Sequence, residues 1–198
     1  MIRNFILIIA FTILGGSSSP LQENLNFDIV HKGNVIGSLN ATKTIKDSKI
    51  YYKTSTTIKT RIIKDVSVNY KYNVVFNDDL LETSVVDITV NGKPHAKTHT
   101  KRVKSVYQVV KDGKNEGLLE TSIYNATIQL YFEEPKNIMR CYSEQAGDFN
   151  TLEALGNHSY KKVNLKGREN IYYYNKGVLE KATIDGGLIK FEIIARNK

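Results

Sequence analysis

The 198-residue chain contains no tryptophan, three prolines and one cysteine. The single cysteine, Cys141, excludes an intramolecular disulfide, so the fold has to be held by its core. We expect this thiol to act as a small buried apolar side chain. Pro20 and Pro135 lie outside the strand patterns, and Pro94 follows a turn, where a strand tolerates proline.

Motifs for familiar chemistry are also missing. The chain has no nucleophile elbow, no phosphate-binding loop and no dinucleotide fingerprint. It has no internal repeat and no Pro/Ser/Gly-rich linker that would separate a second domain. The sequence therefore predicts no catalytic residue and no cofactor.

Long hydrophobic runs are scarce as well. The longest, Phe5–Leu14, is about half the roughly 20 residues that a membrane span needs. Arg3 precedes it, and Gly15–Ser19 supplies small residues before Pro20. This pattern is typical of a signal peptide. We therefore expect residues 1–19 to be a leader, residues 20–198 to be one exported β-rich domain in the periplasm or outside the cell, and the mature chain to have no transmembrane segment.

Acidic residues are outnumbered: 28 Lys and Arg face 20 Asp and Glu, for a formal charge of +8. Export argues against nucleic acid as the partner of this basic chain. Anionic lipid headgroups, acidic glycans or an acidic envelope protein remain as partners, and scattered lysines that only keep the protein soluble are the alternative. The sequence predicts no oligomeric state.

Alternation with period two dominates the chain and predicts half-buried strands. The clearest run is Val66–Phe76, followed by a turn at Asn77–Asp79 and a return strand over Leu80–Val90. Turn pairs such as Asn91-Gly92 and Asp112-Gly113 favour tight hairpins. The prediction is a mainly β protein: one strongly curved antiparallel sheet, a half-barrel or open-barrel meander of roughly a dozen strands, with one short helix.

That helix is expected within Thr121–Glu134, which stops at Pro135. Thr121 or Ser122 could cap it, and proline would end it. The same segment also alternates, so a strand remains possible by pattern, but a short helix crossing the sheet is favoured.

Aromatic side chains are the most suggestive feature for binding. Twelve tyrosines and seven phenylalanines are concentrated in the predicted strands. They could wall a ligand cavity inside a curved sheet, or they could pack an ordinary core, which is the favoured interpretation. The candidate ligand-lining residues are Tyr70, Tyr72, Phe76, Tyr124, Phe132, Tyr172 and Tyr174.

The run Lys93–Arg102 is polar on both faces. Lys97, His99 and Lys101 share one face with His95 and form a candidate basic face. His95 and His99 are four residues apart, which on a strand is about 13 Å, too far for one metal ion, so no metal site is predicted. We expect this strand to be a sheet edge kept soluble by charge, with the rim of a wet groove as the alternative.

Three glutamates, Glu133, Glu134 and Glu144, raise the possibility of a hydrolase with two carboxylates. Such enzymes need the two carboxylates at a defined separation across a cleft. Adjacent glutamates point in different directions in most backbones, so this is the least favoured hypothesis.

Nearly the whole mature chain resembles a family of bacterial exported proteins of unknown function. The resemblance rests on Tyr131-Phe132-Glu133-Glu134-Pro135 and on Tyr142-Ser143-Glu144 with Gly147. It also includes the spaced residues Tyr160, Gly167, Asn170, Tyr172, Tyr174 and Gly177, and an early hairpin from Phe27 through Gly33 to Ile36-Gly37. It implies a curved antiparallel sheet, similar in outline to the half-barrel of periplasmic lipoprotein-localisation carriers. No catalytic residue comes with it, and we expect structural roles for Glu134, Pro135, Ser143, Glu144, Gly147 and Asn170.

Together these features favour a non-enzymatic binding module for an apolar or amphipathic, lipid-like ligand in the cell envelope. The alternative is an envelope structural or interaction protein that docks a partner through a sheet edge or the basic face. A hydrolase that uses Glu134 or Glu144 ranks last.

Overall fold

The computed structural model describes residues 20–61, 65–186 and 189–196. The predicted leader, residues 1–19, lies outside the described residues. The strands are β1 (Leu21–His31), β2 (Asn34–Lys46), β3 (Lys49–Arg61), β4 (Asp65–Asn77), β5 (Leu80–Val90), β6 (Lys93–Val103), β7 (Val106–Lys111), β8 (Lys114–Leu119), β9 (Arg140–Ser143), β10 (Asp148–Gly156), β11 (Ser159–Val163), β12 (Glu169–Asn175), β13 (Val178–Asp185) and β14 (Lys190–Ala195). A 3₁₀ helix, η1 (Thr127–Tyr131), separates β8 from β9.

All fourteen strands form one antiparallel sheet in the order β8-β7-β6-β5-β4-β3-β2-β1-β14-β13-β12-β11-β10-β9. Left-handed turn residues join many of the hairpins, including Asn91 (φ 49°) with Gly92 (φ 76°) and Asp112 (φ 50°) with Gly113 (φ 79°). Two successive positive φ angles are the geometry of the type I′ turn, which matches the twist of the flanking strands. The predicted antiparallel meander is confirmed, with fourteen strands in the described residues rather than about a dozen.

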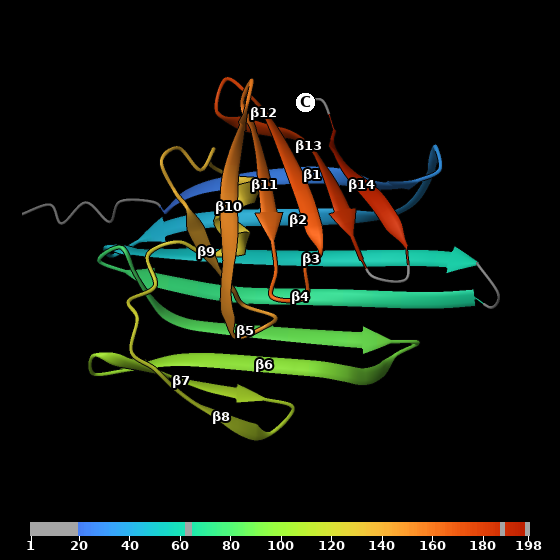
Figure 1. Cartoon of the computed structure of the whole chain (residues 1–198). Coiled ribbons are helices and arrows are strands. Elements are labelled where there is room, and N and C mark those ends of the chain that lie inside the picture. The colour runs from blue at the N-terminus through green and yellow to red at the C-terminus, as the bar shows by residue number, and fades with distance from the viewer. Residues whose placement is uncertain (1–19, 62–64, 187–188, 197–198) are drawn as a thin grey trace, which may run out of the picture.

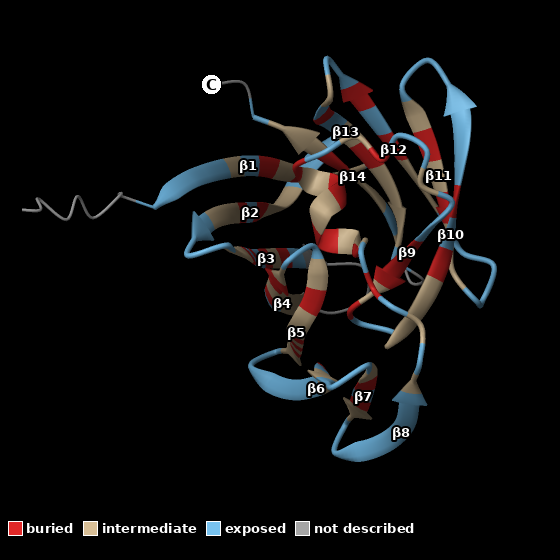
Figure 2. Cartoon of the chain, turned by 90° about the vertical axis from the view of Figure 1, so that its left-hand side faces the viewer, coloured by how far each residue is buried: buried red, intermediate tan, exposed pale blue. Residues whose placement is uncertain are grey.

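The sheet bends back over itself where β1 pairs with β14, with Phe27 opposite Ala195 and Val30 opposite Glu192. We call β1–β8 the first limb and β9–β14 the second limb. In Figure 1 the strands of the second limb cross over those of the first. Figure 2 shows the two limbs on either side of η1, which lies inside the curve. The concave face of the sheet therefore encloses the interior of the protein.

The far ends of the limbs meet through side chains rather than through a strand ladder, so the sheet stays open. Thr98 of β6 donates from Oγ1 to the carbonyl oxygen of Gln145 at 2.9 Å, and the Thr100 and Tyr142 hydroxyls lie 2.7 Å apart. Gly147 in the β9–β10 turn has φ 75°, and a Cβ built there would lie 2.7 Å from Cγ1 of Val109. A glycine at this position thus permits the close approach of the second limb to β7.

The predicted helix over Thr121–Glu134 is smaller than expected. It is a 3₁₀ helix of five residues whose N-cap is Ala126, not Thr121 or Ser122. The reason is that the backbone of the preceding segment is already bonded to strands: Leu81 N–H donates to the Ile123 carbonyl, and Tyr142 N–H to that of Asn125, at 2.9 and 2.7 Å. This segment therefore stays extended. No helix in the described part of the chain is long and apolar enough to cross a membrane.

The prediction that Lys93–Arg102 is a sheet edge is wrong, because β6 pairs with β5 on one side and with β7 on the other. Its inward positions, Thr98 and Thr100, are buried and use their hydroxyls in the contacts that join the limbs. A strand with hydroxyl side chains inward and charged side chains outward looks polar on both faces without being an edge.

One end of the interior is filled by aromatic packing. Tyr52 of β3 lies edge-on to Phe76 of β4, with ring centroids 6.0 Å apart, and 5.4 Å from the ring of Phe132, which follows η1. From the second limb, the Tyr174 hydroxyl donates to the Leu130 carbonyl at 2.7 Å. We call this region the closed end; it fixes η1 in place and so positions the site described next.

Candidate functional site

A cavity of about 480 Å³ occupies the other end of the interior, between the two limbs. We call it the open end. Its size lies within the range of small-molecule binding pockets. A second cavity, beside Leu130 and Cys141, has about 40 Å³, close to the volume of one water molecule, and is too small for an organic ligand.

The first limb supplies a wall of small and aromatic side chains. On β3 the inward positions change from Tyr52 at the closed end to Thr54 and Thr56 at the open end. The register of β3 and β4 places Tyr72 opposite Thr54 and Tyr70 opposite Thr56. Threonine is too short to reach across the curve, so space remains between these strands and the second limb.

The second limb and η1 supply the facing wall and the floor. Thr127, Ile128 and Tyr131 of η1 line the cavity, together with Tyr172 of β12 and Lys162 of β11. The Lys162 residue is 7 % exposed, and its Nζ lies 3.5 Å from the Thr127 hydroxyl and 6.0 Å from the Tyr172 ring centre. The cavity therefore combines apolar walls with a polar floor that holds a buried cation.

Glu144 is fully buried next to this floor, and it holds η1 in place. Its Oε1 accepts the Ile128 backbone N–H at 2.9 Å, while Oε2 has no hydrogen-bond partner among the described residues. Burial raises the pKa of the Glu144 carboxyl. Backbone amides, including that of Ile128, and the Lys162 ammonium act in the opposite direction, but the effect of burial is larger. Its contact with the Ile128 amide fixes the backbone of η1.

The other titratable groups around the floor are held in their neutral forms. Burial raises the pKa of the Cys141 thiol to about 11, and it raises the pKa values of the Tyr131 and Tyr172 hydroxyls. Since the thiolate is the reactive form of cysteine, Cys141 is a poor nucleophile here. The floor therefore offers hydrogen bonds and one positive charge.

The mouth of the cavity carries charge of both signs. The β11–β12 turn contributes Leu165, Lys166 and Arg168, and Lys111 lies on the first limb. Asp148 and Asp185 also line the mouth region. Leu165 is 76 % exposed and is flanked by the cations of its own turn.

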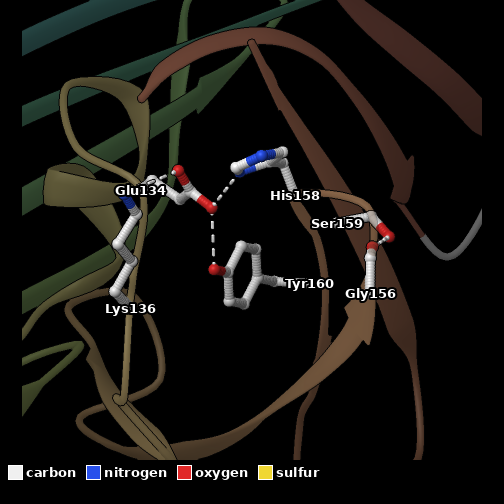
Figure 3. Close-up of polar contacts among 6 residues, drawn as sticks. All are labelled: Glu134, Lys136, Gly156, His158, Ser159 and Tyr160. Carbon is white, nitrogen blue, oxygen red and sulfur yellow. Dashed lines mark hydrogen bonds and ion pairs between the residues drawn. The ribbon is translucent and has the colours of Figure 1, made fainter. Parts of the chain in front are cut away.

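Glu134, the other glutamate singled out from sequence, forms a separate cluster away from this cavity (Figure 3). Its side chain is 3 % exposed, and Oε1 accepts hydrogen bonds from Tyr160 at 2.8 Å and from His158 Nδ1 at 2.9 Å, while Lys136 Nζ lies 3.6 Å from Oε2. Although burial alone would raise it, the net pKa of Glu134 is lowered by the bonds from His158 and Tyr160. This carboxylate joins the loop after η1 to the β10–β11 hairpin.

The two glutamates therefore do not face each other across a cleft. Glu134 borders the 40 Å³ cavity, and Glu144 faces the η1 backbone. Glu133 is exposed and pairs with Lys43. This arrangement gives no support to a hydrolase built on these carboxylates.

The structure separates the seven candidate ligand-lining residues. Tyr70, Tyr72 and Tyr172 line the large cavity. The other three rings belong to the closed end. Phe76 and Phe132 both pack against Tyr52, and Tyr174 donates a hydrogen bond to Leu130 of η1. Tyr124 is 56 % exposed, since it lies on the outward side of the extended segment before η1.

The remaining motif residues have local structural contacts. Asn170 accepts the Asp185 backbone N–H at 2.9 Å, and Ser143 accepts that of Ala146 at 3.2 Å, while both also line the cavity. Pro135 is buried and borders the small cavity. Ser143 and Asn170 thus fix local backbone at the open end, whereas Pro135 lies beside the small cavity.

The basic face lies on the outer surface of β6. Lys97 Nζ is 3.3 Å from the Asp87 carboxylate, and His99 Nε2 is 3.4 Å from the Thr83 hydroxyl, whereas Lys101 is exposed. Its charge is thus partly balanced by the neighbouring strand. Among the described residues, no cluster of three or more His, Cys, Asp or Glu could hold a metal ion.

Sequence reasoning missed the polar residues of the cavity: Lys162, Asn150, Thr54 and Thr56. Each of these residues is buried at an inward position of a strand, but the sequence alone does not show which face of these strands points inward. Polar residues at inward positions indicate that the facing wall does not fill the space or that a polar partner is needed.

The fold and cavity define an all-β protein whose single curved sheet encloses a pocket lined by apolar and polar side chains. The chain belongs to the DUF6134 family, a domain of unknown function, whose model matches residues 27–196. Neither a curated protein nor a solved structure matches the chain significantly.

Proposed function

We propose that the protein is a non-enzymatic binding protein for an amphipathic, lipid-like ligand, which it holds in the 480 Å³ cavity between the two limbs. The observation that carries the proposal is the cavity itself, in a chain that fills the rest of its interior tightly. Protein interiors normally contain few voids larger than a water molecule. The cavity between the limbs is larger than such voids and opens to solvent at its mouth, so a ligand could enter and fill it.

The lining fits an amphiphile rather than a fully apolar or fully polar molecule. Ile29, Leu39 and Ile193 from the middle of the sheet supply aliphatic surface, and Tyr70 and Tyr72 supply rings with polar tips. Lys162 and Asn150 place polar groups inside the same space. A molecule with an apolar body and one polar group matches both halves of the lining.

Export and charge agree with such a ligand. The predicted leader would deliver the protein to the cell envelope. The basic side chains of Lys166 and Arg168 beside the exposed Leu165 would favour approach to an anionic membrane surface, from which a lipid-like molecule could be taken up.

The test is to fill the cavity by substitution. Thr56 is an inward residue of the cavity wall, and its neighbour Ser55 is exposed on the outer face of the same strand. T56F and S55F therefore place the same ring inside and outside the cavity. Binding is measured by titrating each purified protein with 1-anilinonaphthalene-8-sulfonate, an amphipathic dye that fluoresces in apolar sites.

We expect the wild type and S55F to bind one equivalent of dye with the same affinity, and T56F to lose most of that binding while it keeps the circular dichroism of the wild type. Equal saturable binding by all three proteins, or no saturable binding by the wild type, would contradict the proposal.

The sheet edge formed by β8 supports a second candidate function. β8 ends the strand order, and Lys114–Leu118 are exposed along it. Such an edge is a site for strand addition by a partner protein. If the dye does not bind, docking of an envelope protein at this edge becomes the leading function, and K114P/E116P, which would block strand addition, tests it.

A further inference from the structure

Two adjacent lysines of β11, Lys161 and Lys162, differ in their ionic partners. Lys161 points outward, where its Nζ lies 3.0 Å from Glu153 and 3.8 Å from Glu169. Lys162 points inward to the cavity, and no carboxylate of the described residues lies within 4 Å of its Nζ. The outward lysine is paired twice, and the buried lysine has no ionic partner at contact distance.

The hydrogen bonds of Lys162 are also incomplete. An ammonium carries three N–H donors, and Lys162 uses one of them in a bond of 3.5 Å to the Thr127 hydroxyl. That hydroxyl donates its own proton to the Tyr142 carbonyl at 3.1 Å, so it acts toward Lys162 as an acceptor. The other donors of the ammonium have no partner at hydrogen-bond distance in the described structure.

A buried cation with so few partners is unfavourable, because removing a charge from water costs several kcal/mol unless it is paired. Glu144 interacts electrostatically with Lys162, but its Oε1 is bonded to the Ile128 amide and the two side chains form no ion pair within 4 Å. Burial also raises the pKa of Glu144, which favours its neutral form. The positive charge of Lys162 is thus available to something in the cavity.

We propose that Lys162 binds the head group of the ligand, and that this head group is a carboxylate inserted into the cavity ahead of its apolar chain. Asn150 is the second polar side chain at this place: it is buried, lines the cavity, and lies one inward position along β10 from Leu152, the cross-strand partner of Lys162. Its amide can donate to the same head group. The aliphatic and tyrosine walls then surround the chain.

Charge selects a carboxylate over a phosphate. One ammonium neutralises one carboxylate, whereas a phosphate monoester carries about −1.5 to −2 charges at pH 7. The excess negative charge would be buried near Glu144, since the second cations of the site, Lys166 and Arg168, lie in the exposed turn at the mouth. The ligand class is therefore a single-chain carboxylic acid such as a fatty acid.

This inference rests on the proposed function. Its test distinguishes a failure of the Lys162 head-group site from a failure of the proposed function. Dodecanoate, dodecanol and dodecyl phosphate share one chain and differ in the head group. Their affinities are measured by isothermal titration calorimetry for the wild type, for K162M and for K161M. The K161M variant is the matched control, because it removes the same charge from the outer face of the same strand. K162Q is a second inner variant that keeps a polar side chain.

We expect the wild type and K161M to bind dodecanoate roughly 10- to 100-fold more tightly than dodecanol, as a hydrogen-bonded ion pair predicts, and more tightly than dodecyl phosphate. K162M and K162Q should lose this preference and keep the affinity for dodecanol. If all proteins bind the acid and the alcohol equally, the cavity binds amphiphiles but Lys162 is no head-group site. A wild type that prefers the phosphate also overturns the carboxylate assignment. If the wild type binds none of the three, the proposed function itself fails.

Discussion

The closed and open ends of the interior are built from the same strands, yet one is packed and the other is hollow. On β3 the inward side chain is Tyr52 at the closed end and Thr54 and Thr56 at the open end. On β4 the corresponding change is from Phe76 to Tyr72. The pairing of β3 with β4 continues without a register shift between the two ends.

The difference shows that side-chain volume and polarity, rather than strand pairing, decide where this sheet encloses a cavity. The closed end joins its rings to η1, and the Tyr174 hydroxyl there donates to the Leu130 carbonyl. The open end leaves Lys162 with one long hydrogen bond. The first region stabilises the fold, and the second has the features of a site.

The largest effect should come from truncating an aromatic ring in each region. F76A removes a buried ring that packs against Tyr52, and we expect a loss of about 3–5 kcal/mol in the free energy of unfolding. Y72A removes a ring that already borders empty space, and the expected loss is roughly 1 kcal/mol. Urea denaturation followed by fluorescence measures both. Equal losses of stability in F76A and Y72A would contradict the distinction between a packed closed end and a hollow open end.

The contact that brings the limbs together at their far ends should be the next most sensitive. In G147A the new methyl group would lie 2.7 Å from Cγ1 of Val109 at a φ of 75°, so we expect a loss of about 2–3 kcal/mol. V109A alone should cost less, and in the double variant G147A/V109A the clash is relieved while the backbone strain remains. The double variant should thus be more stable than G147A. Strictly additive losses would show that the methyl group added in G147A does not clash with Val109.

The Glu134 cluster predicts that the ionised Glu134 carboxylate stabilises the closed end and that acid removes this stabilisation. The pKa of Glu134 is lower in the folded protein than its ordinary value of 4.5, so the carboxylate stabilises the fold above pH 4.5. That stabilisation is lost as the pH falls below this value and the carboxylate takes up a proton. E134Q should be less stable than the wild type by about 1–2 kcal/mol at pH 7, and the gap should narrow on acidification.

Thermal melts of both proteins between pH 3 and pH 7 check this behaviour. E133Q is the control, because Glu133 is the adjacent exposed glutamate. A constant difference between E134Q and the wild type at every pH would contradict a role for the charge of Glu134.

The smallest effects should come from removing single hydroxyl groups. Tyr142 shares a buried 2.7 Å hydrogen bond with Thr100, so Y142F should cost about 1 kcal/mol. Tyr72 makes a 3.4 Å contact with the exposed Gln145 side chain, so Y72F should change stability by less than about 0.5 kcal/mol. Denaturant titration of the two variants, side by side with the wild type, compares the same chemical deletion at two sites.

Much of the fold could be predicted from the sequence, because period-two alternation and turn pairs such as Asn91-Gly92 report local geometry directly. The same alternation assigned Tyr72 and Phe76 to one face but could not tell that Tyr72 faces a cavity and Phe76 a packed core. That depends on the facing limb, which is more than 90 residues away in the sequence at Tyr172. The position of β6 inside the sheet was missed for a similar reason: Thr98 and Thr100 are buried by partners from the second limb.

The cavity residues Lys162 and Asn150 were also outside the reach of sequence patterns. Lys161 and Lys162 are identical neighbours, and only the pairing of β11 with β10 and β12 shows which of them points inward. A polar residue at an inward position is visible in the sequence only after the inward face is known.

The most direct test of a hollow, ligand-binding open end is native mass spectrometry of the wild type, T56F and S55F, each purified from the organism that produces the protein, with organic extraction of bound molecules. The cavity predicts one equivalent of an amphipathic molecule on the wild type and its loss from T56F, with S55F like the wild type. An equal ligand content in all three proteins, or a wild type with no bound amphiphile that also fails to bind dodecanoate and dodecanol, would contradict the account.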